Sequence, residues 1–304
     1  MKRIILAGGS GFIGQALAPV FLAKGYNVVV LGRGAVRHEG GGDYLQWDGQ
    51  TLGAWASAID GAEAIVNLTG KNINCRHNAE NRREIIRSRV DSVRILGEAI
   101  AHCAKPPKVF VQTSGVGYYG DTGDQVVEEG APHGNDFSAE VCRQWEGAFD
   151  DLNLPGTRKV VLRLGVVLGR TGGALPMLEK ITRLFLGGAV GSGRQFISWI
   201  HVVDLVEMFV AAIEQEELSG VFNATAPVPV TNSEFMRELR RALHRPWSPP
   251  VPEPFARVGA WAMGTEGDLA LLSNRCAPRR FSEHGFHFRF PNLRDALAHL
   301  YPNK

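Results

Sequence analysis

Three glycines near the start of the chain have the spacing of a phosphate-binding loop. They are Gly8, Gly11 and Gly14. The apolar run 1–7 before them is typical of a buried strand, and residues 15–24 after them have helical spacing. Such glycines permit a tight turn, close approach of backbone N–H groups to a pyrophosphate, and close helix–strand packing. The helix N-terminus adds partial positive charge. The sequence therefore predicts a dinucleotide site, and a glycine-rich structural turn is the alternative.

The residues after the second predicted strand bear on which dinucleotide is bound. NAD-binding loops place an Asp or Glu at the end of this strand, where it bonds the ribose 2′-OH. Here the strand 27–31 is followed by Arg33 between two glycines, and no acid precedes Glu39. Arg33 is therefore free to bind a 2′-phosphate, and the Ser10 hydroxyl can add a contact. We predict NADP (NADPH) as the cofactor, ahead of NAD, and an exposed loop arginine without a ligand as the alternative.

Composition and charge limit the class of protein. The chain has 304 residues, 44% of them hydrophobic, with a formal charge of +2, too mild for a nucleic-acid or membrane surface. The four cysteines are scattered without metal-ligand spacing, which favours reduced thiols and no metal site. No apolar run has the length of a membrane span, and the chain enters a strand without room for a signal peptide. We expect a soluble, cytoplasmic protein with a small-molecule substrate, and treat a homodimer as a candidate assembly.

The elements that must position this loop alternate between strand and helix. We predict strands at 1–7, 27–31, 43–47, 64–68, 108–113, 159–164 and 221–225, and helices at 15–24, 52–59, 79–103, 137–150, 175–186 and 205–214. This alternation predicts an α/β fold with a doubly wound parallel sheet. We expect residues 1–165 to form the NADP-binding domain, with segments near 195–225 returning to it, and 166–304 a smaller substrate-side domain. Residues 247–254 predict an extended connector, and 286–290 alternate like a short strand.

Several motifs in the same order resemble the extended short-chain dehydrogenase/reductase superfamily. They are Gly8-x-x-Gly11-x-x-Gly14, Asn67-x-x-Gly70, Thr113-Ser114-(x)4-Tyr119-Gly120, Leu162-Arg163-x-Gly165-x-Val167-x-Gly169 and Arg194-x-Phe196-(x)4-His201-Val202-x-Asp204. Segments 115–120, 191–195 and 285–291 are similar to an atypical subgroup of NAD-dependent epimerase/dehydratase-like proteins, usually labelled "epimerase family protein" and mostly of unknown substrate. The resemblance implies a Rossmann fold. The cofactor-binding positions that we expect are Gly8, Ser10, Gly11, Phe12, Ile13, Gly14, Arg33, Asp48, Leu68, Thr69 and Gly70.

One departure from the superfamily bears directly on catalysis. Its enzymes use a Tyr-x-x-x-Lys pair on the helix after the serine strand, but this chain has neither Tyr nor Lys from 121 to 158. Phe137 stands where the tyrosine should be, and phenylalanine cannot donate a proton. The usual serine position also falls on Gly115, one residue after Ser114. The atypical subgroup shares this loss.

The catalytic candidates are therefore the polar groups that remain near the end of the serine strand. Ser114 lies where open α/β sheets bind ligands, although its hydroxyl can equally form a turn. Tyr119 and Tyr118 are the nearest phenols. We assign Tyr119 to catalysis and Tyr118 to the substrate wall, with wall-lining as the commoner role for both. Glu140 and Cys142 are weaker proton carriers.

Three further residues are candidates for substrate binding. Arg163 and Arg194 can hold an anionic group through a bidentate fork, and a structural salt bridge is the alternative. For Arg194, in a glycine-rich loop, we favour the ligand. His201 can titrate near neutrality, although a structural histidine before Asp204 is the favoured reading.

Two functions remain open from the sequence. The first is an NADP-dependent oxidoreductase or epimerase-like enzyme with an unidentified small substrate, phosphorylated or nucleotide-linked. The second is a non-catalytic dinucleotide-binding sensor or regulatory protein. Cofactor binding is common to both, and the missing Tyr/Lys pair separates them.

Overall fold

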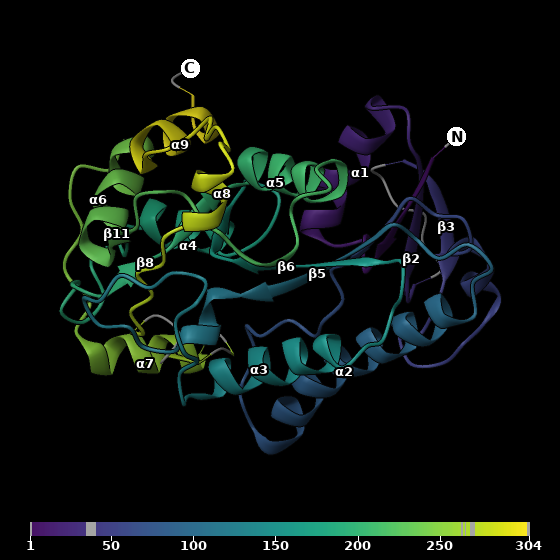
Figure 1. The fold of residues 1–304 in the computed structure, drawn as a ribbon. Coiled ribbons are helices and arrows are strands. Elements are labelled where there is room, and N and C mark those ends of the chain that lie inside the picture. The colour runs from purple at the N-terminus through teal and green to yellow at the C-terminus, as the bar shows by residue number, and fades with distance from the viewer. Residues whose placement is uncertain (1, 35–40, 263, 265, 268–270, 303–304) are drawn as a thin grey trace.

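The computed structural model describes residues 2–34, 41–262, 264, 266–267 and 271–302. Within them, the main sheet has seven parallel strands in the spatial order β10-β6-β5-β4-β1-β2-β3 (Figure 1). These strands are β1 (Arg3–Ala7), β2 (Asn27–Gly32), β3 (Asp43–Gln46), β4 (Ala64–Asn67), β5 (Val109–Gly115), β6 (Arg158–Leu164) and β10 (Gly220–Ala224). The strand order reverses between β1 and β4, the position at which open α/β sheets bind ligands. The predicted doubly wound parallel sheet is confirmed.

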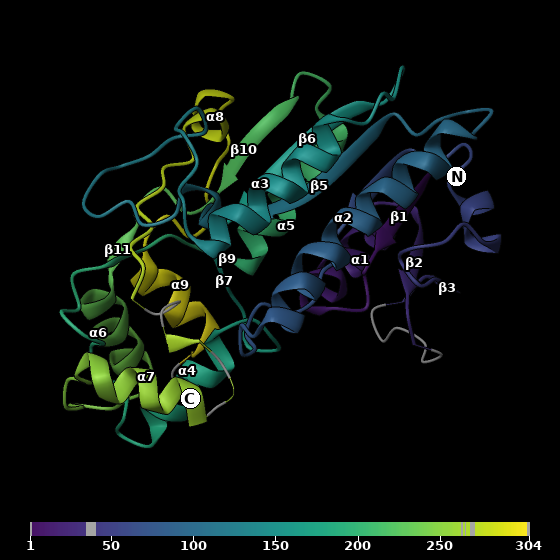
Figure 2. The same cartoon turned by 90° about the horizontal axis from the view of Figure 1, so that it is seen from below.

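Helices cover both faces of this sheet (Figures 1 and 2). They are α1 (Phe12–Ala23) and α5 (Val202–Glu214) on one face, and α2 (Ala79–Ala101) and α3 (Phe137–Asp150) on the other. Alternate residues of strand β1 point to the two faces of the sheet and belong to different apolar cores. Ile4 and Leu6 belong to the core under α1 and α5, whereas Ile5 belongs to the core under α2 and α3. Each is fully buried, as expected for a strand with helices on both sides.

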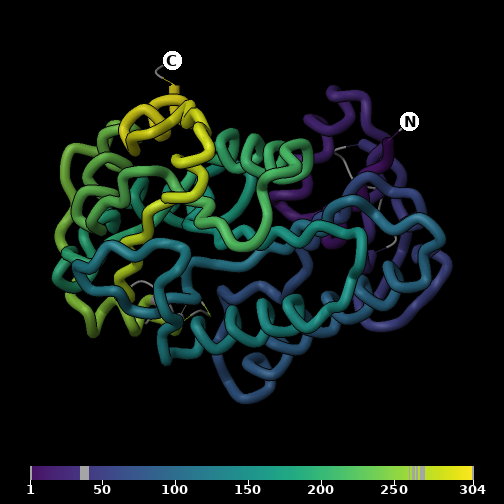
Figure 3. Tube along the Cα trace, viewed as in Figure 1, coloured from purple at the N-terminus to yellow at the C-terminus, as the bar shows by residue number. Residues whose placement is uncertain are grey.

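The chain after β6 builds most of a second cluster of elements with its own apolar core. Its elements are β7 (Val166–Leu168), α4 (Leu175–Arg183), β8 (Phe196–Ile197), β9 (Trp199–His201), β11 (Val230–Thr231), α6 (Asn232–Ala242), α7 (Glu253–Ala262) and α9 (Leu293–Leu300). Trp199, Phe235 and Leu297 are central to the core. Figure 3 shows the teal-to-yellow segments of this cluster gathered at one end of the molecule and the purple N-terminal segments at the other. Helix α5, strand β10 and helix α8 (Arg279–Glu283) return to the main sheet, where Phe281 of α8 is buried in the core under α1 and α5.

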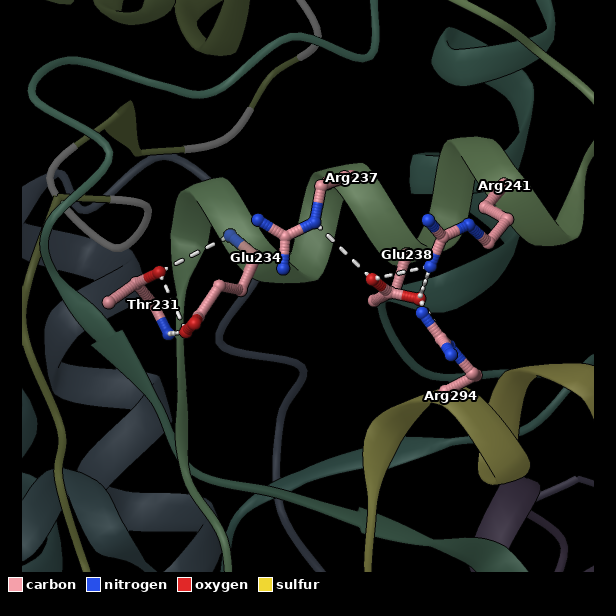
Figure 4. A network of polar contacts seen from close by, with 6 residues as sticks. All are labelled: Thr231, Glu234, Arg237, Glu238, Arg241 and Arg294. Carbon is pink, nitrogen blue, oxygen red and sulfur yellow. Dashed lines mark hydrogen bonds and ion pairs between the residues drawn. The ribbon is translucent and has the colours of Figure 1, made fainter.

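Helix α6 has a polar cap at its start and an ion pair to helix α9 one turn later (Figure 4). Thr231 caps α6, since its hydroxyl accepts a bond from the Glu234 backbone N–H, and the Glu234 carboxylate accepts one from the Thr231 N–H. One turn later, Glu238 forms ion pairs with Arg237 and Arg241 of α6 and with Arg294 of α9. This contact joins segments more than fifty residues apart in the chain.

Four local predictions differ from the structure. Residues 54–58 form a short 3-10 helix rather than an α-helix over 52–59. Helix α5 begins at Val202 rather than at 205, because His201 caps it. The tail at 286–290 is not a strand, since the backbone N–H groups of Arg289 and Phe290 bond the Asp204 carboxylate instead of a neighbouring strand. The predicted connector 247–254 also ends early, at the start of α7.

Two further expectations concern membranes and the glycine-rich loop after β2. Across the part of the chain that the structure describes, no helix has the length and apolar character needed to span a bilayer. Residues 35–40 of the loop, Glu39 among them, lie outside the described residues.

Candidate functional site

The glycine loop joins β1 to α1 through a turn that side chains would disrupt. Gly8 has a φ of +73°, and its N–H donates to the Leu31 carbonyl oxygen at 2.8 Å. A Cβ on Gly14 would lie 2.1 Å from the Gly9 carbonyl oxygen, so helix and loop touch here. A Cβ on Gly11 would meet only the Gly8 carbonyl oxygen, at 3.6 Å, so the loop is open at this point. The two glycines therefore have different roles. Gly14 permits close packing of helix and loop, and Gly11 leaves the surface of the loop accessible.

The first turn of α1 is left without a side-chain cap. Its cap residue is Gly11, and Ser10 before it is exposed. The first N–H groups of a helix have no partners within the helix, so an anion can bind them. Phe12 and Ile13 are half-buried, and the Phe12 ring packs against the loop at 169–173, where a Cβ on Gly172 would lie 2.6 Å from it. The loop at 169–173, from the second half of the chain, therefore packs against the start of α1.

Two predicted cofactor residues beyond the loop have different surroundings. Arg33 is exposed directly after β2, and its guanidinium has no polar partner among the described residues. Asp48 is also exposed, but its carboxylate accepts bonds from the backbone N–H groups of Gln50 and Thr51 and from the Thr51 hydroxyl. These bonds lower the pKa of Asp48 to about 2, the Thr51 hydroxyl contributing most. Asp48 is thus an anion held in a local turn.

The segment after β4 borders the glycine loop. A Cβ on Gly8 would lie 3.0 Å from Thr69, whose Oγ1 is buried and has no hydrogen-bond partner in the described chain. Leu68 beside it is half-buried. Gly70 is exposed, and a Cβ there would lie 2.9 Å from the guanidinium carbon of Arg89 on α2. The predicted segments 8–14 and 68–70 are therefore brought together.

Ser114 lies at the end of β5 in a pocket of about 240 Å³. Its side chain is buried, and apart from a weak contact with the Cys142 thiol its Oγ has no hydrogen-bond partner among the described residues. The pocket is lined by Ile73, Arg89, Ser114, Gly115, Gly117, Gly120, Asp136, Ser138, Val141, Cys142, Trp145, Leu272 and Asn274. Burial, with a smaller effect of Glu146, raises the pKa of the Cys142 thiol to about 11, so this thiol is neutral at physiological pH. The pocket thus presents hydroxyl, thiol, carboxylate and guanidinium groups.

Arg163 on β6 forms a buried cluster beside this pocket. Its Nε and Nη2 donate to the two Glu146 carboxylate oxygens at 2.9 and 2.7 Å, and its Nη1 donates to the Tyr119 hydroxyl at 2.9 Å. That hydroxyl donates to the Asn223 Oδ1 at 2.7 Å, and burial raises the pKa of Tyr119 well above its usual range. The guanidinium also lies 3.4 Å from the Tyr118 ring centroid. Tyr119 and Arg163 therefore already bind protein partners and do not line the pocket.

Phe137 occupies the first position of α3. The Arg82 guanidinium carbon lies 4.1 Å from its ring centroid, and the His77 ring packs edge-on at 5.0 Å. Phe137 lines a second pocket, of about 440 Å³, that shares Asp136 and Ser138 with the Ser114 pocket. The position of the superfamily tyrosine thus faces a cavity, but with a ring that carries no proton.

The remaining substrate candidates lie elsewhere. Arg194 is exposed and its side chain has no polar partner among the described residues. His201 is buried, and its Nδ1 accepts the Val203 N–H while its Nε2 contacts the His299 Nδ1 at 3.2 Å. Burial, followed by His299, lowers the pKa of His201 to about 4. His201 thus acts as a neutral cap of α5.

Among the residues of the Ser114 pocket that sequence reasoning missed are Arg89, Asp136 and Trp145. Arg89 and Trp145 stand inside amphipathic helices, where spacing alone does not show which residues of another element they face. The Asp136 position before α3 does signal a helix cap, and its Oδ1 accepts the Ala139 N–H. Among the described residues, no group of three or more His, Cys, Asp or Glu side chains could hold a metal ion.

Known proteins match this fold and this loop over nearly the whole chain. The sequence model of the NAD dependent epimerase/dehydratase family matches residues 4–224, and that of a domain of unknown function (DUF1731) matches residues 251–300. Epimerase family protein SDR39U1 of Bos taurus is 38% identical, over 98% of this chain and 99% of its own. Epimerase family protein YfhF of Bacillus subtilis is 34% identical, over 98% of this chain and 97% of its own.

A solved structure agrees with these relatives. The crystal structure of human epimerase family protein SDR39U1 with NADPH matches with a TM-score of 0.89 and 34% identity, and covers 99% of this chain and 100% of that one. The resemblance inferred from the motifs is confirmed. The chain belongs to the NAD dependent epimerase/dehydratase family.

Proposed function

We propose that this protein binds NADPH across Gly8–Gly14 and acts as an oxidoreductase or epimerase-like protein on an unidentified small molecule. The observation that carries the proposal is the uncapped start of α1 behind an open glycine loop. The human relative described above, 34% identical, was crystallised with NADPH. A cytoplasmic location belongs to the same proposal, since the cysteines are free thiols, as in reducing compartments.

Three features of the chain fit this cofactor. The space before Gly11 is open to a pyrophosphate. The Thr69 Oγ1 beside Gly8 is buried without a partner, as expected of a group that bonds a ligand. Arg33, not an acid, follows β2, and its side chain is exposed. An acid there would repel a 2′-phosphate, whereas a guanidinium attracts it.

Different residues would bind different parts of NADPH. Backbone N–H groups of the loop would hold the pyrophosphate, with Ser10, Phe12 and Ile13 around it. Arg33 would hold the 2′-phosphate, and the segments at Asp48 and 68–70 would border the rest of the nucleotide. When bound, NADPH supplies a hydride. The substrate would then lie in the pocket beside Ser114.

The proposed site lacks the usual pair of residues for proton transfer. General acid–base catalysis is typically worth about 10²–10⁴-fold, and the Tyr/Lys pair that provides it elsewhere is absent. Ser114 and Ser138 supply the hydroxyls at the pocket, whereas the Tyr119 hydroxyl already bonds Asn223 and Arg163. We therefore expect slow or narrowly specific turnover, and little or none with ordinary sugar-nucleotide epimerase substrates. Phe137 favours the second candidate function, a non-catalytic dinucleotide sensor, since its ring fills the place of the acid.

The experiment is a pair of dissociation constants, for NADPH and NADH, measured by calorimetry on wild type and on Arg33→Asp. We expect wild type to prefer NADPH and the variant to invert the preference, because it replaces attraction by repulsion. Arg194→Asp is the matched control, since it changes the charge equally in an exposed loop at the substrate side. Equal affinities in wild type, or a ratio unchanged by Arg33→Asp, would rule out Arg33 as the selector. Absence of binding of both dinucleotides to well-folded protein would refute the proposal.

A further inference from the structure

The Ser114 pocket contains a cation without a counter-ion. The Arg89 Nη1 donates to the backbone oxygens of Lys71 and Ile85, at 3.0 and 2.9 Å, and the guanidinium carbon lies 4.9 Å from the Trp145 ring centroid. No carboxylate among the described residues forms an ion pair with Arg89. Burial lowers the pKa of this guanidinium, which means that the protein solvates its charge less well than water does. A half-buried charge of this kind is stabilised by a partner of opposite charge.

Hydrogen-bond donors without partners line the same pocket. Ser114 is 4% exposed and Trp145 is 7% exposed, yet within the described chain the Trp145 Nε1 has no partner and the Ser114 Oγ has only a weak contact with the Cys142 thiol. Buried polar groups are nearly always bonded, so two on one pocket indicate a missing ligand. The indole N–H and the remaining guanidinium N–H groups can only donate. The ligand must therefore bring acceptor atoms.

The acid of the pocket does not balance Arg89. Asp136 caps α3, where its Oδ1 accepts the Ala139 N–H at 2.9 Å and its charge meets the positive end of the helix. Its Oδ2 has no partner among the residues that the structure describes and faces Gly120, where a Cβ would lie 2.9 Å away. This oxygen is an acceptor for a hydroxyl or amide of the ligand. It leaves the guanidinium available.

The position of Arg89 also links the pocket to the proposed cofactor loop. Any side chain at Gly70 would meet the guanidinium, at 2.9 Å from its carbon, so the absence of a side chain leaves room for it. The pocket walls include Ile73, Val141 and Leu272, which are apolar. Its volume, about 240 Å³, lies below the roughly 300–1,000 Å³ typical of sites for drug-sized ligands.

We propose that this pocket binds the carboxylate of a small organic acid, with Arg89 as its counter-ion and Trp145 and Ser114 as further donors. The planar guanidinium suits a planar carboxylate, and the apolar walls suit a short hydrocarbon chain. The assignment of this acid as the substrate rests on the proposed function. The assignment of the pocket does not, because it follows from groups that the chain itself presents.

The test uses hexanoate and its uncharged counterpart hexanamide, titrated calorimetrically into the full chain with and without NADPH. We expect hexanoate to bind at least about tenfold more tightly than hexanamide, since a charge-assisted bond is stronger than a neutral one. Arg89→Met should weaken hexanoate binding by a similar factor and leave NADPH affinity unchanged. Arg87→Met is the matched control, an exposed arginine of the same helix, and should bind hexanoate as wild type does.

A second variant covers the case in which Arg89→Met does not fold. Trp145→Phe keeps the ring beside Arg89 and removes the indole donor, so it should weaken hexanoate several-fold and hexanamide less. Equal binding of hexanoate and hexanamide, or of neither, would overturn the proposal. So would tighter binding of inorganic phosphate than of hexanoate, or a loss of NADPH affinity in Arg89→Met, which would assign the arginine to the cofactor. Failure of NADPH alone to bind would refute the proposed function and leave the hexanoate result to decide the pocket.

Discussion

Ser114 and Arg163 are direct neighbours on adjacent strands, yet the Arg163 side chain is well hydrogen-bonded within the protein and the Ser114 side chain is not. They pair across β5 and β6, on the sheet face covered by α2 and α3. Arg163 bonds Glu146 and Tyr119, whereas the Ser114 Oγ has only a weak contact with the Cys142 thiol in the described chain. A completed buried network fixes one arrangement of the fold, and an incomplete one leaves its bonds to a ligand. The difference separates structural residues from ligand-binding ones where residue type alone does not.

The largest expected effect comes from breaking the completed cluster. Arg163→Met should lower the free energy of unfolding by about 3–5 kcal/mol, because Glu146 would be left buried and unpaired. Urea denaturation measures this, and NADPH affinity at low temperature should not change. Replacing both partners, with Arg163→Met and Glu146→Leu, should restore part of the stability. If Arg163→Met were as stable as wild type but bound ligand poorly, Arg163 would belong to the ligand site.

Acid should weaken a second completed cluster, around His201. Its pKa is lowered from 6.5 to about 4, so the unfolded chain takes up a proton that the folded protein excludes. The stability present above pH 6.5 should therefore fall as the pH drops towards 4, by at most about 1.4 kcal/mol per pH unit. Thermal unfolding across this range measures the slope. His201→Asn should flatten it, while His287→Asn, at an exposed histidine, should not.

The smallest effect distinguishes two hydroxyls near the end of β5. Tyr119→Phe should cost about 1–2 kcal/mol, because it leaves the Asn223 Oδ1 and an Arg163 N–H without a partner. Ser114→Ala should leave stability within about 0.5 kcal/mol of wild type, since it removes a group whose contact in the described chain is a weak one with the Cys142 thiol. Both are measured by denaturant unfolding. A larger loss for Ser114→Ala than for Tyr119→Phe would reverse the comparison.

The fold was predictable because its signals are local. Apolar runs such as 27–31 and 64–68 predict buried strands, and the glycines at 8–14 predict the first turn. The tail at 286–290 was not predictable, because its alternation is that of a strand while its backbone partner, Asp204, lies more than eighty residues away. The start of α5 was missed because histidine is an uncommon cap.

The site could be predicted from the sequence only where a functional residue lies at the end of a strand or at the start of a helix. Ser114 at the end of a strand and Gly11 at the start of a helix are such cases. Arg163 and Tyr119 have residue types suited to catalysis, but Glu146 and Asn223, which bond them, come from other elements. Arg89 presents the opposite case: a helix arginine without a sequence signal faces the pocket because α2 packs against α3.

The central claim is that NADPH binds the glycine loop beside the incomplete pocket and leaves the Arg163 cluster untouched. Hydrogen–deuterium exchange of the full chain, with and without NADPH, tests it most directly. The account predicts slower exchange in peptides covering 8–14, 68–70 and 114–117, and unchanged exchange in those covering 129–131 and 158–164. Unchanged exchange over 8–14, or protection confined to the Arg163 cluster, would contradict it.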